Sequence, residues 1–245
     1  MSEVILSVEN LTVSFDGFKA VDSLNFSVDK DELRCVIGPN GAGKTTLLDM
    51  ICGKTKPSQG RIRFKNLDLH NMIEYQITRV GVGRKFQNPS VYEDLTVLEN
   101  LEISDPRKRG ILGSLLFKRE RDLLDKIDSV AEKIFLQEML RFKAGQLSHG
   151  QKQWLEIGML LMQDPELMLL DEPVAGMSAR EREQTAELLN SISAGRSLVV
   201  IEHDMAFVKM IAHTVTVLHQ GKMLAEGSMD TVQNDERVIE VYLGH

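Results

Sequence analysis

Residues 38–46 read GPNGAGKTT, a glycine-rich segment that ends in Gly-Lys-Thr-Thr. The apolar run 33–37, broken only by Arg34, comes before it, and a helix-like run follows over residues 46–52. A strand, a glycine-rich turn, Gly-Lys-Thr and a helix in this order form the pattern G-x-x-x-x-G-K-[ST] in its required context. The sequence therefore predicts a phosphate-binding loop here.

The chemistry of this loop follows from its residue types. Glycines at 38, 41 and 43 have no Cβ, so the backbone can turn sharply and approach a ligand closely. Backbone N–H groups then converge on an anion at a helix start, where the helix dipole favours negative charge. Lys44 is expected to reach β- and γ-phosphates, and the Thr45 hydroxyl to bind Mg²⁺. The candidate nucleotide-binding residues of the loop are Gly38, Pro39, Asn40, Gly41, Ala42, Gly43, Lys44, Thr45 and Thr46.

Composition limits the class of protein. The chain has 245 residues, of which 42% are hydrophobic, enough for a sizeable core in one compact domain. A formal charge of −7 argues against nucleic acid as a partner, because nucleic-acid binders are more often basic. No apolar run approaches the ~20 residues that span a bilayer, and the first ten residues lack a signal-peptide pattern. We therefore expect a cytosolic protein, with Cys35 and Cys52 as buried free thiols.

The chain before the loop, residues 3–37, is predicted to be rich in β-strands, because apolar residues alternate there. Two aromatic residues in it, Phe15 and Phe18, fit equally well as core side chains or as platforms for a nucleotide base. A later strand is predicted over residues 80–87. Gln87 ends that strand, where open α/β sheets bind their ligands, and is a candidate ligand-facing side chain.

Residues 88–162 have a helical pattern, with two helix starts marked by capping boxes. Thr96 and Glu99 form one, and Ser148 and Gln151 the other, with Gly150 between them. The second start could bind an anion, although taken alone an ordinary capped helix is the better interpretation. The basic segment DPRKRG, residues 105–110, is interpreted as a solvated loop rather than a membrane contact.

Acids and a histidine follow two further predicted strands. Residues 167–170 run directly into Asp171 and Glu172, which indicates a buried parallel strand with carboxylates at its tip. Asp171 is placed to hold a metal ion, and Glu172 to orient or deprotonate a water molecule. The strand over residues 197–201 leads to His203, which could contact a γ-phosphate or the water, or could simply be satisfied within a turn. A β-hairpin with its turn at residues 220–221 follows.

Together these motifs resemble those of ABC ATPases in order and spacing. GPNGAGKT matches the Walker A loop, Gln87 the Q-loop, LSHGQ at residues 147–151 the signature, LMLLDE at 167–172 the Walker B strand and His203 the H-loop. The resemblance implies one ABC ATPase domain over residues 1–245. Its fold would be α/β: a RecA-like P-loop NTPase core, an antiparallel β subdomain and an α-helical signature subdomain at about residues 88–164.

The resemblance also implies a head-to-tail dimer that binds ATP and Mg²⁺. Phe15 matches the aromatic residue that stacks on adenine. Gln87 joins Thr45 and Asp171 as a metal ligand and joins Glu172 and His203 in catalysis. The signature residues would bind the γ-phosphate of an ATP held by the partner subunit; these residues are Ser148, Gly150 and Gln151.

Within the family, the chain resembles the branched-chain amino-acid importer type, and in that type the ATP-binding subunits of urea transporters. The stretches that carry this resemblance include GRKFQNPSVYEDLTVLENLEIS, EPVAGMS and RVIEVYLGH. The implied partners are membrane-spanning permease subunits, a second ATPase subunit and, indirectly, a periplasmic solute-binding protein. The implied location is the inner face of the plasma membrane, and the implied activity is ATP-driven uptake of urea or a short-chain amide.

Three other functions are alternatives to urea uptake. Branched-chain amino-acid import is the alternative within the family. A non-transport ABC ATPase that acts on nucleic acid or ribosomes is disfavoured, because the interval between residues 46 and 146 is too short for a long coiled coil and there is one signature. A regulatory module that only binds nucleotide is disfavoured, because Lys44, Asp171, Glu172 and His203 are all present.

Two residues depart from the family pattern. His149 stands where the signature LSGGQ has its first glycine, so its side chain either faces out of the site or alters phosphate contacts. Ser178 stands where many relatives have the D-loop aspartate, which puts communication between two sites through that aspartate in question.

Overall fold

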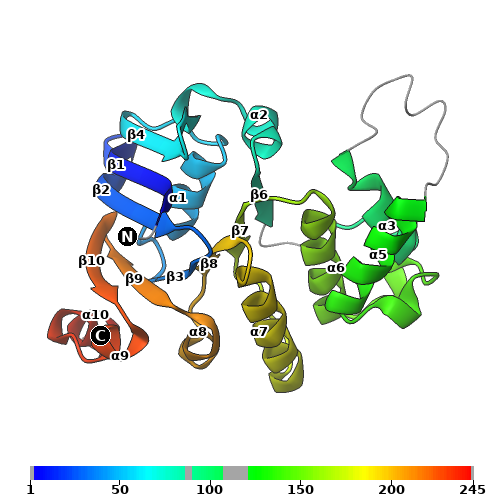
Figure 1. Ribbon diagram of the computed structural model, residues 1–245. Coiled ribbons are helices and arrows are strands. Elements are labelled where there is room, and N and C mark those ends of the chain that lie inside the picture. The colour runs from blue at the N-terminus through cyan, green and yellow to red at the C-terminus, as the bar shows by residue number, and fades with distance from the viewer. Residues whose placement is uncertain (1–2, 86–89, 107–120, 244–245) are drawn as a thin grey trace. The chain divides into compact units, whose positions relative to one another are not determined.

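The computed structural model describes residues 3–85, 90–106 and 121–243 (Figure 1). The chain folds into two compact units. The core unit comprises residues 1–84, 166–173 and 189–245, and the helical unit comprises residues 85–165 and 174–188. In the part of the chain that the structure describes, no helix is long and apolar enough to cross a membrane.

The core unit begins with a four-stranded antiparallel sheet. Its strand order is β2-β1-β4-β5, and the first two strands form a long hairpin in which Phe15 pairs with Phe18. Both aromatic side chains are exposed, Phe15 by 49% and Phe18 by 66%, so the core interpretation is wrong for each of them. The strands of this sheet are β1 Val4–Phe15, β2 Phe18–Asp29, β4 Gln59–Phe64 and β5 Leu67–Asp68.

A second, six-stranded sheet has the order β10-β9-β3-β8-β7-β6. Strand β3 pairs in parallel with β8 and β9, and β7 pairs in parallel with β8. Every residue of β3, β7 and β8 is buried, which explains why these strands are continuous apolar runs. The strands are β3 Leu33–Ile37, β6 Val82–Lys85, β7 Leu167–Asp171, β8 Ser197–Ile201, β9 Thr214–His219 and β10 Lys222–Gly227.

Strands β9 and β10 form the predicted antiparallel hairpin. Its turn residues, Gln220 and Gly221, both have positive φ angles, 48° and 77°, which confirms the predicted turn. In the described part of the core unit, the α-helices that lie wholly within it are α1 Lys44–Ile51, α2 Glu74–Arg79, α8 Met205–Ile211, α9 Met229–Gln233 and α10 Glu236–Leu243.

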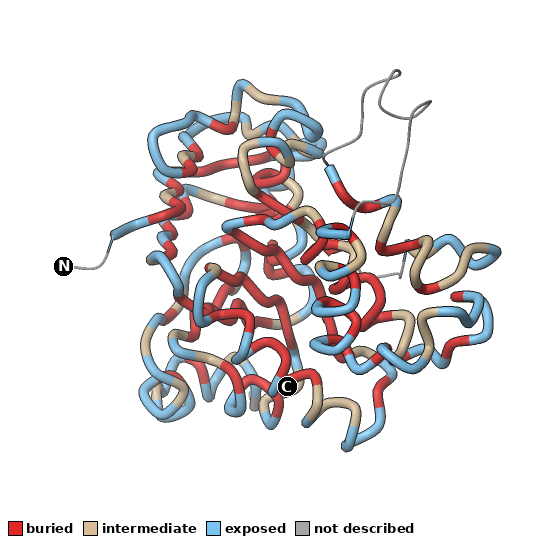
Figure 2. Tube along the Cα trace, turned by 45° about the vertical axis from the view of Figure 1, so that its right-hand side comes forward, coloured by how far each residue is buried: buried red, intermediate tan, exposed pale blue. Residues whose placement is uncertain are grey.

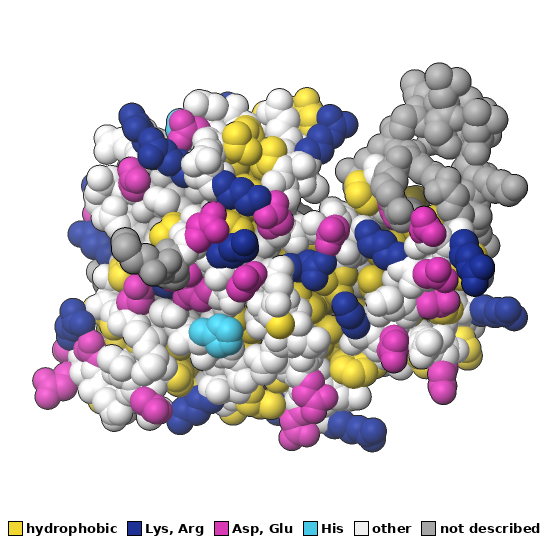
Figure 3. All heavy atoms as spheres, in the orientation of Figure 1, with side chains coloured by type: hydrophobic (Ala, Val, Ile, Leu, Met, Phe, Trp, Pro, Cys, Tyr) yellow, Lys and Arg dark blue, Asp and Glu magenta, His cyan; other side chains and the backbone are white. Residues whose placement is uncertain are grey.

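The core of this unit is formed by side chains from both sheets and from α1. Figure 2 colours the chain by burial, and β3, β7 and β8 are buried along their whole length. Cys35 and Cys52 are buried free thiols, as predicted. On the face shown in Figure 3, basic and acidic side chains are interspersed, in keeping with a mixed, mildly acidic composition.

The helical unit is built from α3 Val97–Ile103, α5 Arg121–Lys133, α6 His149–Met162 and the first part of α7 Ala179–Ser193. Both predicted capping boxes are confirmed, since the hydroxyls of Thr96 and Ser148 accept from backbone N–H groups three residues later. Trp154 anchors the unit's core, because its indole N–H donates to Thr185 at 2.8 Å. Most of the basic segment 105–110 lies outside the described residues.

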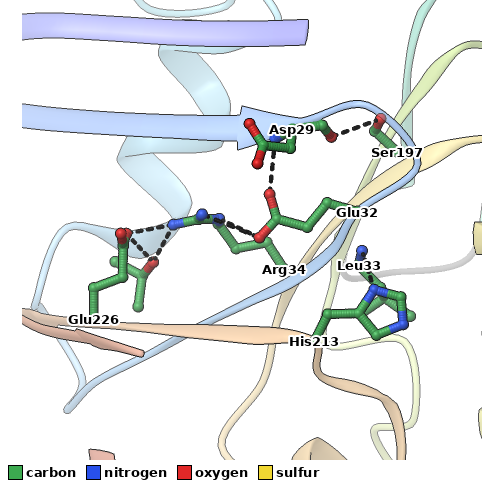
Figure 4. A network of polar contacts seen from close by, with 8 residues as sticks. Asp29, Glu32, Leu33, Arg34, Ser197, His213 and Glu226 are labelled. Carbon is green, nitrogen blue, oxygen red and sulfur yellow. Dashed lines mark hydrogen bonds and ion pairs between the residues drawn. The ribbon is translucent and has the colours of Figure 1, made fainter. Parts of the chain in front are cut away.

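Strand β3 contains Arg34, the one charged residue of its apolar run, and the structure shows how this charge is compensated (Figure 4). The guanidinium donates to Glu32 and Thr216 at 3.0 and 3.1 Å and forms an ion pair with Glu226 on β10. It also lies 5.5 Å from the centre of the Phe26 ring. Arg34 is therefore a buried cation whose charge is neutralised by acidic neighbours.

Candidate active site

The predicted phosphate loop, Asp171, Glu172 and His203 all follow neighbouring strands of one sheet. The loop follows β3, the acids end β7 and His203 follows β8, and these strands lie in the order β3-β8-β7. Because parallel strands end at the same edge, this edge gathers the phosphate loop, the two acids and the histidine. That is where open α/β sheets bind ligands. Gln87, the remaining candidate of the predicted catalytic set, lies outside the described residues.

The phosphate loop requires glycine at two positions because backbone lies close on both. Gly38 has φ 149°, and a Cβ there would lie 2.2 Å from the carbonyl oxygen of Leu218 on β9. Gly43 has φ 99°, and a Cβ there would lie 2.5 Å from the Ala20 carbonyl oxygen. The β9–β10 turn also contacts the loop, since the Gly221 N–H donates to the Ala42 oxygen at 3.1 Å. The loop is thus held by β2, β9 and the hairpin turn.

Helix α1 starts at the loop with an N-terminus suited to an anion. Its N-cap is Gly43, which offers no side-chain cap, and its first turn contains no acid. The first N–H groups of a helix have no intrahelical partner, and the helix dipole places partial positive charge there. A phosphate group fits these donors.

Lys44, the first residue of α1, is largely buried and is held by the loop itself. Its Nζ donates to the carbonyl oxygens of Gly38 and Pro39 at 2.8 and 3.0 Å. Burial lowers the pKa of this ammonium, while the charges of Glu172 and Asp171 oppose that shift. Among the described residues Lys44 forms no ion pair, so its charge is available to a phosphate.

Asp171 and Thr45 offer oxygen atoms for a divalent cation. Thr45 lies close enough to Asp171 for its hydroxyl to lower the pKa of that carboxylate, which places the two side chains next to each other. Burial raises the pKa of Asp171, and the nearby Arg84 charge counters this shift. A carboxylate and a hydroxyl beside a phosphate site are the donors that Mg²⁺ prefers. The residues present therefore fit Mg²⁺ bound together with a nucleotide.

Arg84 on β6 is a buried neighbour of this site that sequence reasoning missed. Its guanidinium donates to Asp49 on α1 at 2.5 Å and lies 3.7 Å from the Asp171 carboxylate. One cation thus links the helix after the phosphate loop to the acid at the end of β7. A basic residue inside a strand pattern was the available signal, but its partners are distant in sequence.

Glu172 and His203 face each other. The His203 Nδ1 lies 3.5 Å from the Glu172 Oε1, with the imidazole exposed and the carboxylate less so. Glu172 has φ 46°, a left-handed conformation that side chains other than glycine seldom adopt. Such conformations are concentrated at functional sites. A carboxylate and an imidazole at this distance could together position and deprotonate a water molecule.

The signature residues lie in the helical unit and are described there alone. Ser148 caps α6 and Gln151 completes the capping box. The carboxylate of Glu181 lies so close to Gly150 that a Cβ on this glycine would be 2.4 Å from its Oε1. A side chain at position 150 would therefore require the flexible end of the Glu181 side chain to move aside.

The two departures from the family pattern meet in this unit. The His149 Nε2 lies 3.2 Å from the Ala175 carbonyl oxygen, so the side chain is turned toward residues 175–178. The Ser178 hydroxyl donates to Glu181 at 2.7 Å and holds the acid that packs on Gly150. The hydrogen bonds of Ser178 lower the pKa of Glu181, and the His149 charge acts in the same direction. His149 and Ser178 thus tie the signature to the D-loop within one chain.

A P-loop at the end of a parallel strand, with acids and a histidine at the next strand ends, defines a nucleotide-hydrolysing P-loop protein. Comparison with known proteins gives the family. A family model described as "ABC transporter" matches residues 21–175, and one described as "Branched-chain amino acid ATP-binding cassette transporter" matches residues 222–245. The chain belongs to the ATP-binding subunits of ABC transporters and is an ATPase.

Similar proteins span the whole chain. The "High-affinity branched-chain amino acid transport ATP-binding protein LivG" of Escherichia coli (strain K12) is 35% identical, over 100% of this chain and 99% of that protein. BraF, a protein of the same description from Pseudomonas aeruginosa, is 34% identical over the same shares. A probable LivG of Methanocaldococcus jannaschii is 34% identical, over 98% of this chain and 97% of that one. These three relatives are branched-chain amino-acid transport proteins, so they do not support the resemblance to urea transporters in particular.

Solved structures confirm the predicted fold class. An ATP-binding cassette of an ABC transporter in its ADP conformation superposes with a TM-score of 0.87 at 34% identity, over 100% of both chains. A nucleotide-free ATP-binding cassette superposes with a TM-score of 0.85 at 33% identity, over 99% of this chain and 100% of that one. The fold is therefore that of an ABC ATPase, with its P-loop NTPase core.

Proposed function

We propose that this chain is the ATP-hydrolysing subunit of an importer for branched-chain amino acids. The observation that carries the hydrolytic part is the sheet edge where Lys44, Thr45, Asp171, Glu172 and His203 meet. The solute class rests on relatives that match the chain over almost its full length. They favour branched-chain amino acids over urea or a short-chain amide, and transport over a nucleic-acid or ribosome function.

Binding of ATP follows from the loop geometry. The N–H groups of residues 38–46 would surround the phosphates, and Lys44 would exchange its two carbonyl partners for phosphate oxygens. Phe15, exposed by 49%, is free to stack on adenine. Thr45 and Asp171, together with Gln87, would hold Mg²⁺, which supplies positive charge beside the phosphate oxygens.

Hydrolysis requires a base and a group that holds the attacking water. Glu172 accepts the proton of that water, because its carboxylate is at the tip of β7 beside the predicted γ-phosphate position. His203 hydrogen-bonds the water or a γ-phosphate oxygen. Because the His203 Nδ1 lies 3.5 Å from the Glu172 Oε1, the water stays within reach of Glu172. Lys44 stabilises the negative charge that develops on the phosphate.

The second half of the site comes from another ATPase subunit. Ser148, Gly150 and Gln151 form a helix start suited to a phosphate, and they belong to a unit different from the one that holds the phosphate loop. We assign them to an ATP bound by the partner subunit in a head-to-tail dimer. Closure of two such subunits completes both sites and is the motion that transport can use.

The remaining partners follow from the transport role. Permease subunits would hold the chain on the inner face of the plasma membrane, and a periplasmic solute-binding protein would act through them. Residues 1–245 form the single ATPase domain in this proposal, with a helical subdomain at about 88–164 that carries the signature.

The catalytic assignment is tested with Glu172→Gln in the assembled transporter. ATP binding should persist while the turnover number falls about 10³-fold, because loss of a general base costs 10²–10⁴-fold. Glu187→Gln, at an exposed position of α7, is the matched control and should hydrolyse ATP at the wild-type rate. Normal turnover by Glu172→Gln would remove Glu172 from the base role.

The solute is tested separately by uptake into vesicles that contain the permeases, the binding protein and this subunit. Radiolabelled leucine, isoleucine or valine should accumulate with ATP and not with Glu172→Gln. Uptake of urea without uptake of these amino acids would reject the proposed solute class and leave the ATPase assignment intact.

A further inference from the structure

A cavity lies in the core unit, where α8, α9 and α10 meet the end of β3. Figure 1 shows α9 and α10 next to the β9–β10 hairpin. The cavity has a volume of ≈ 290 Å³, and its apolar wall includes Ile37, Met205, Val238 and Ile239. None of the residues assigned to the nucleotide in this chain lines it. It is therefore separate from the phosphate loop's ligand-binding face.

The wall of this cavity also holds a few polar groups. Lys209 on α8, Gln233 on α9 and Tyr242 on α10 border it. Lys209 is exposed, and among the residues that the structure describes it forms no ion pair. No aspartate or glutamate lines the cavity. The charge available to a ligand is therefore one unpaired cation beside an apolar surface.

The cavity is connected to the catalytic elements by short structural links. The backbone N–H of Gly38, in the phosphate loop, lies close to the Tyr242 hydroxyl. Burial raises the pKa of this phenol to about 12, so Tyr242 is neutral at physiological pH. Ile37 directly precedes the loop, and Met205 begins the helix that follows His203. A molecule in the cavity would therefore touch side chains next to both motifs.

We propose that this cavity is a binding site for a small aliphatic monocarboxylate. The volume lies just below the ~300–1,000 Å³ of typical ligand sites, which suits a short hydrocarbon chain better than a nucleotide or a lipid. The hydrocarbon packs on Ile37, Val238 and Ile239, and the carboxylate pairs with Lys209. An ammonium group would find no carboxylate in this wall, so an amino acid is a poorer ligand than the matching acid without an amine.

Calorimetric titration of the full-length protein, without nucleotide, tests this proposal with 4-methylpentanoate as the probe. A ligand of this size should bind with a dissociation constant of about 1 mM or tighter. The uncharged 4-methylpentan-1-ol, with the same hydrocarbon, should bind at least about tenfold more weakly, because it lacks the charge that pairs with Lys209.

Variants locate the binding. Lys209→Met should weaken binding of the carboxylate about tenfold and leave binding of the alcohol unchanged, since only the ion pair is lost. Ile239→Asp should abolish binding of both, because a carboxylate would enter the apolar wall. Lys133→Met, an exposed lysine on α5, is the matched control and should bind like the wild type. Urea unfolding curves establish that each variant is folded.

Two results would overturn the proposal. One is no heat of binding at about 20 mM 4-methylpentanoate, and the other is equal affinity of the wild type and Lys209→Met for this probe. The measurement is independent of the proposed transport function, because it uses neither ATP nor a permease. ATP affinity measured in parallel should be the same for Lys209→Met and the wild type, which separates a failure of this site from a failure of the phosphate loop.

Discussion

Two buried cations, Arg34 within β3 and Lys44 just after it, are compensated in opposite ways. Arg34 has two carboxylates, a hydroxyl and an aromatic ring around its guanidinium. Lys44 has two backbone carbonyl oxygens. Carboxylates neutralise a charge, whereas carbonyls only solvate it. The difference separates a cation that maintains the fold from one that is kept for a negatively charged ligand.

The acids nearest to Lys44 agree with this distinction. Asp171 interacts with Thr45 and Arg84, and Glu172 faces His203. Both acids influence Lys44 through space, but neither forms an ion pair with it within the described residues. Burying a charge without such a pair costs free energy unless a ligand supplies the opposite charge. The desolvation of Lys44 is therefore compensated when a phosphate binds.

The largest expected effect is that of Lys44→Ala on nucleotide binding. Two charge-assisted hydrogen bonds to phosphate, at roughly 1.5–3 kcal/mol each, would be lost, so affinity for ATP should fall about 1,000-fold. Fluorescence titration with a labelled ATP analogue measures this. Unfolding by urea should change little, because no carboxylate loses an ion pair. Tight ATP binding by the variant would contradict the proposed use of this cation.

Arg34→Met should show the reverse of Lys44→Ala: a large loss of stability with little change in ATP affinity. Removing the guanidinium leaves the carboxylate of Glu32 buried, so the free energy of unfolding should fall by about 3 kcal/mol. ATP affinity should stay within about twofold of the wild type. Urea denaturation measures the stability, with the double variant Glu32→Gln/Arg34→Met as a control that should recover part of the loss. A change confined to ATP affinity would show that the two cations are not distinct in role.

Arg84→Lys tests a third cation, one that contacts both the fold and the site. Lysine keeps the charge but loses the planar fork that reaches Asp49 and Asp171 together. Partners of metal ligands typically contribute 10–100-fold, so the Mg²⁺ concentration for half-maximal binding of labelled ATP should rise about tenfold. An unchanged Mg²⁺ dependence would assign Arg84 to the fold alone.

The smallest effect is expected at an exposed ion pair, Asp22 with Lys19 and Lys222. Hydrogen bonds from Lys19, the larger cause, and from Lys222 lower the pKa of Asp22 below its ordinary value of 3.8. A lowered pKa adds stability above pH 3.8, and that stability is lost as the pH falls through the folded-state pKa. The wild type should therefore melt slightly above Asp22→Asn at pH 7. The two melting temperatures should converge in acid, and a gap that widened there would contradict this sign.

Much of the fold could be predicted from local sequence patterns. The buried runs that became β3, β7 and β8 were recognisable because parallel strands are apolar on both faces. Because each run ends in a chemically distinctive residue, the phosphate loop, Asp171–Glu172 and His203 could be placed at one edge. Both capping boxes were found because they depend on residues three apart.

The features that were missed depend on contacts between distant segments. Alternation along β1 and β2 does not reveal which aromatic residues another layer covers, and Phe15 and Phe18 turned out exposed. Arg84 meets Asp49 and Asp171 only after the sheet has formed. The contact of Tyr242 with Gly38 joins residues near opposite ends of the chain.

The turn between β9 and β10 has a practical consequence for protein engineering. Hairpin tips are usually the positions that accept an inserted tag or reporter domain. Here the tip residue Gly221 is buried and donates to Ala42, and a Cβ on it would lie 2.9 Å from the Ala20 oxygen. An insertion at Gly221 would displace the wall of the phosphate loop. Gly17, at the β1–β2 tip, has nothing within 4 Å of its Cβ position, so an insertion there would meet no such backbone contact but would stand next to Phe15, the proposed adenine platform.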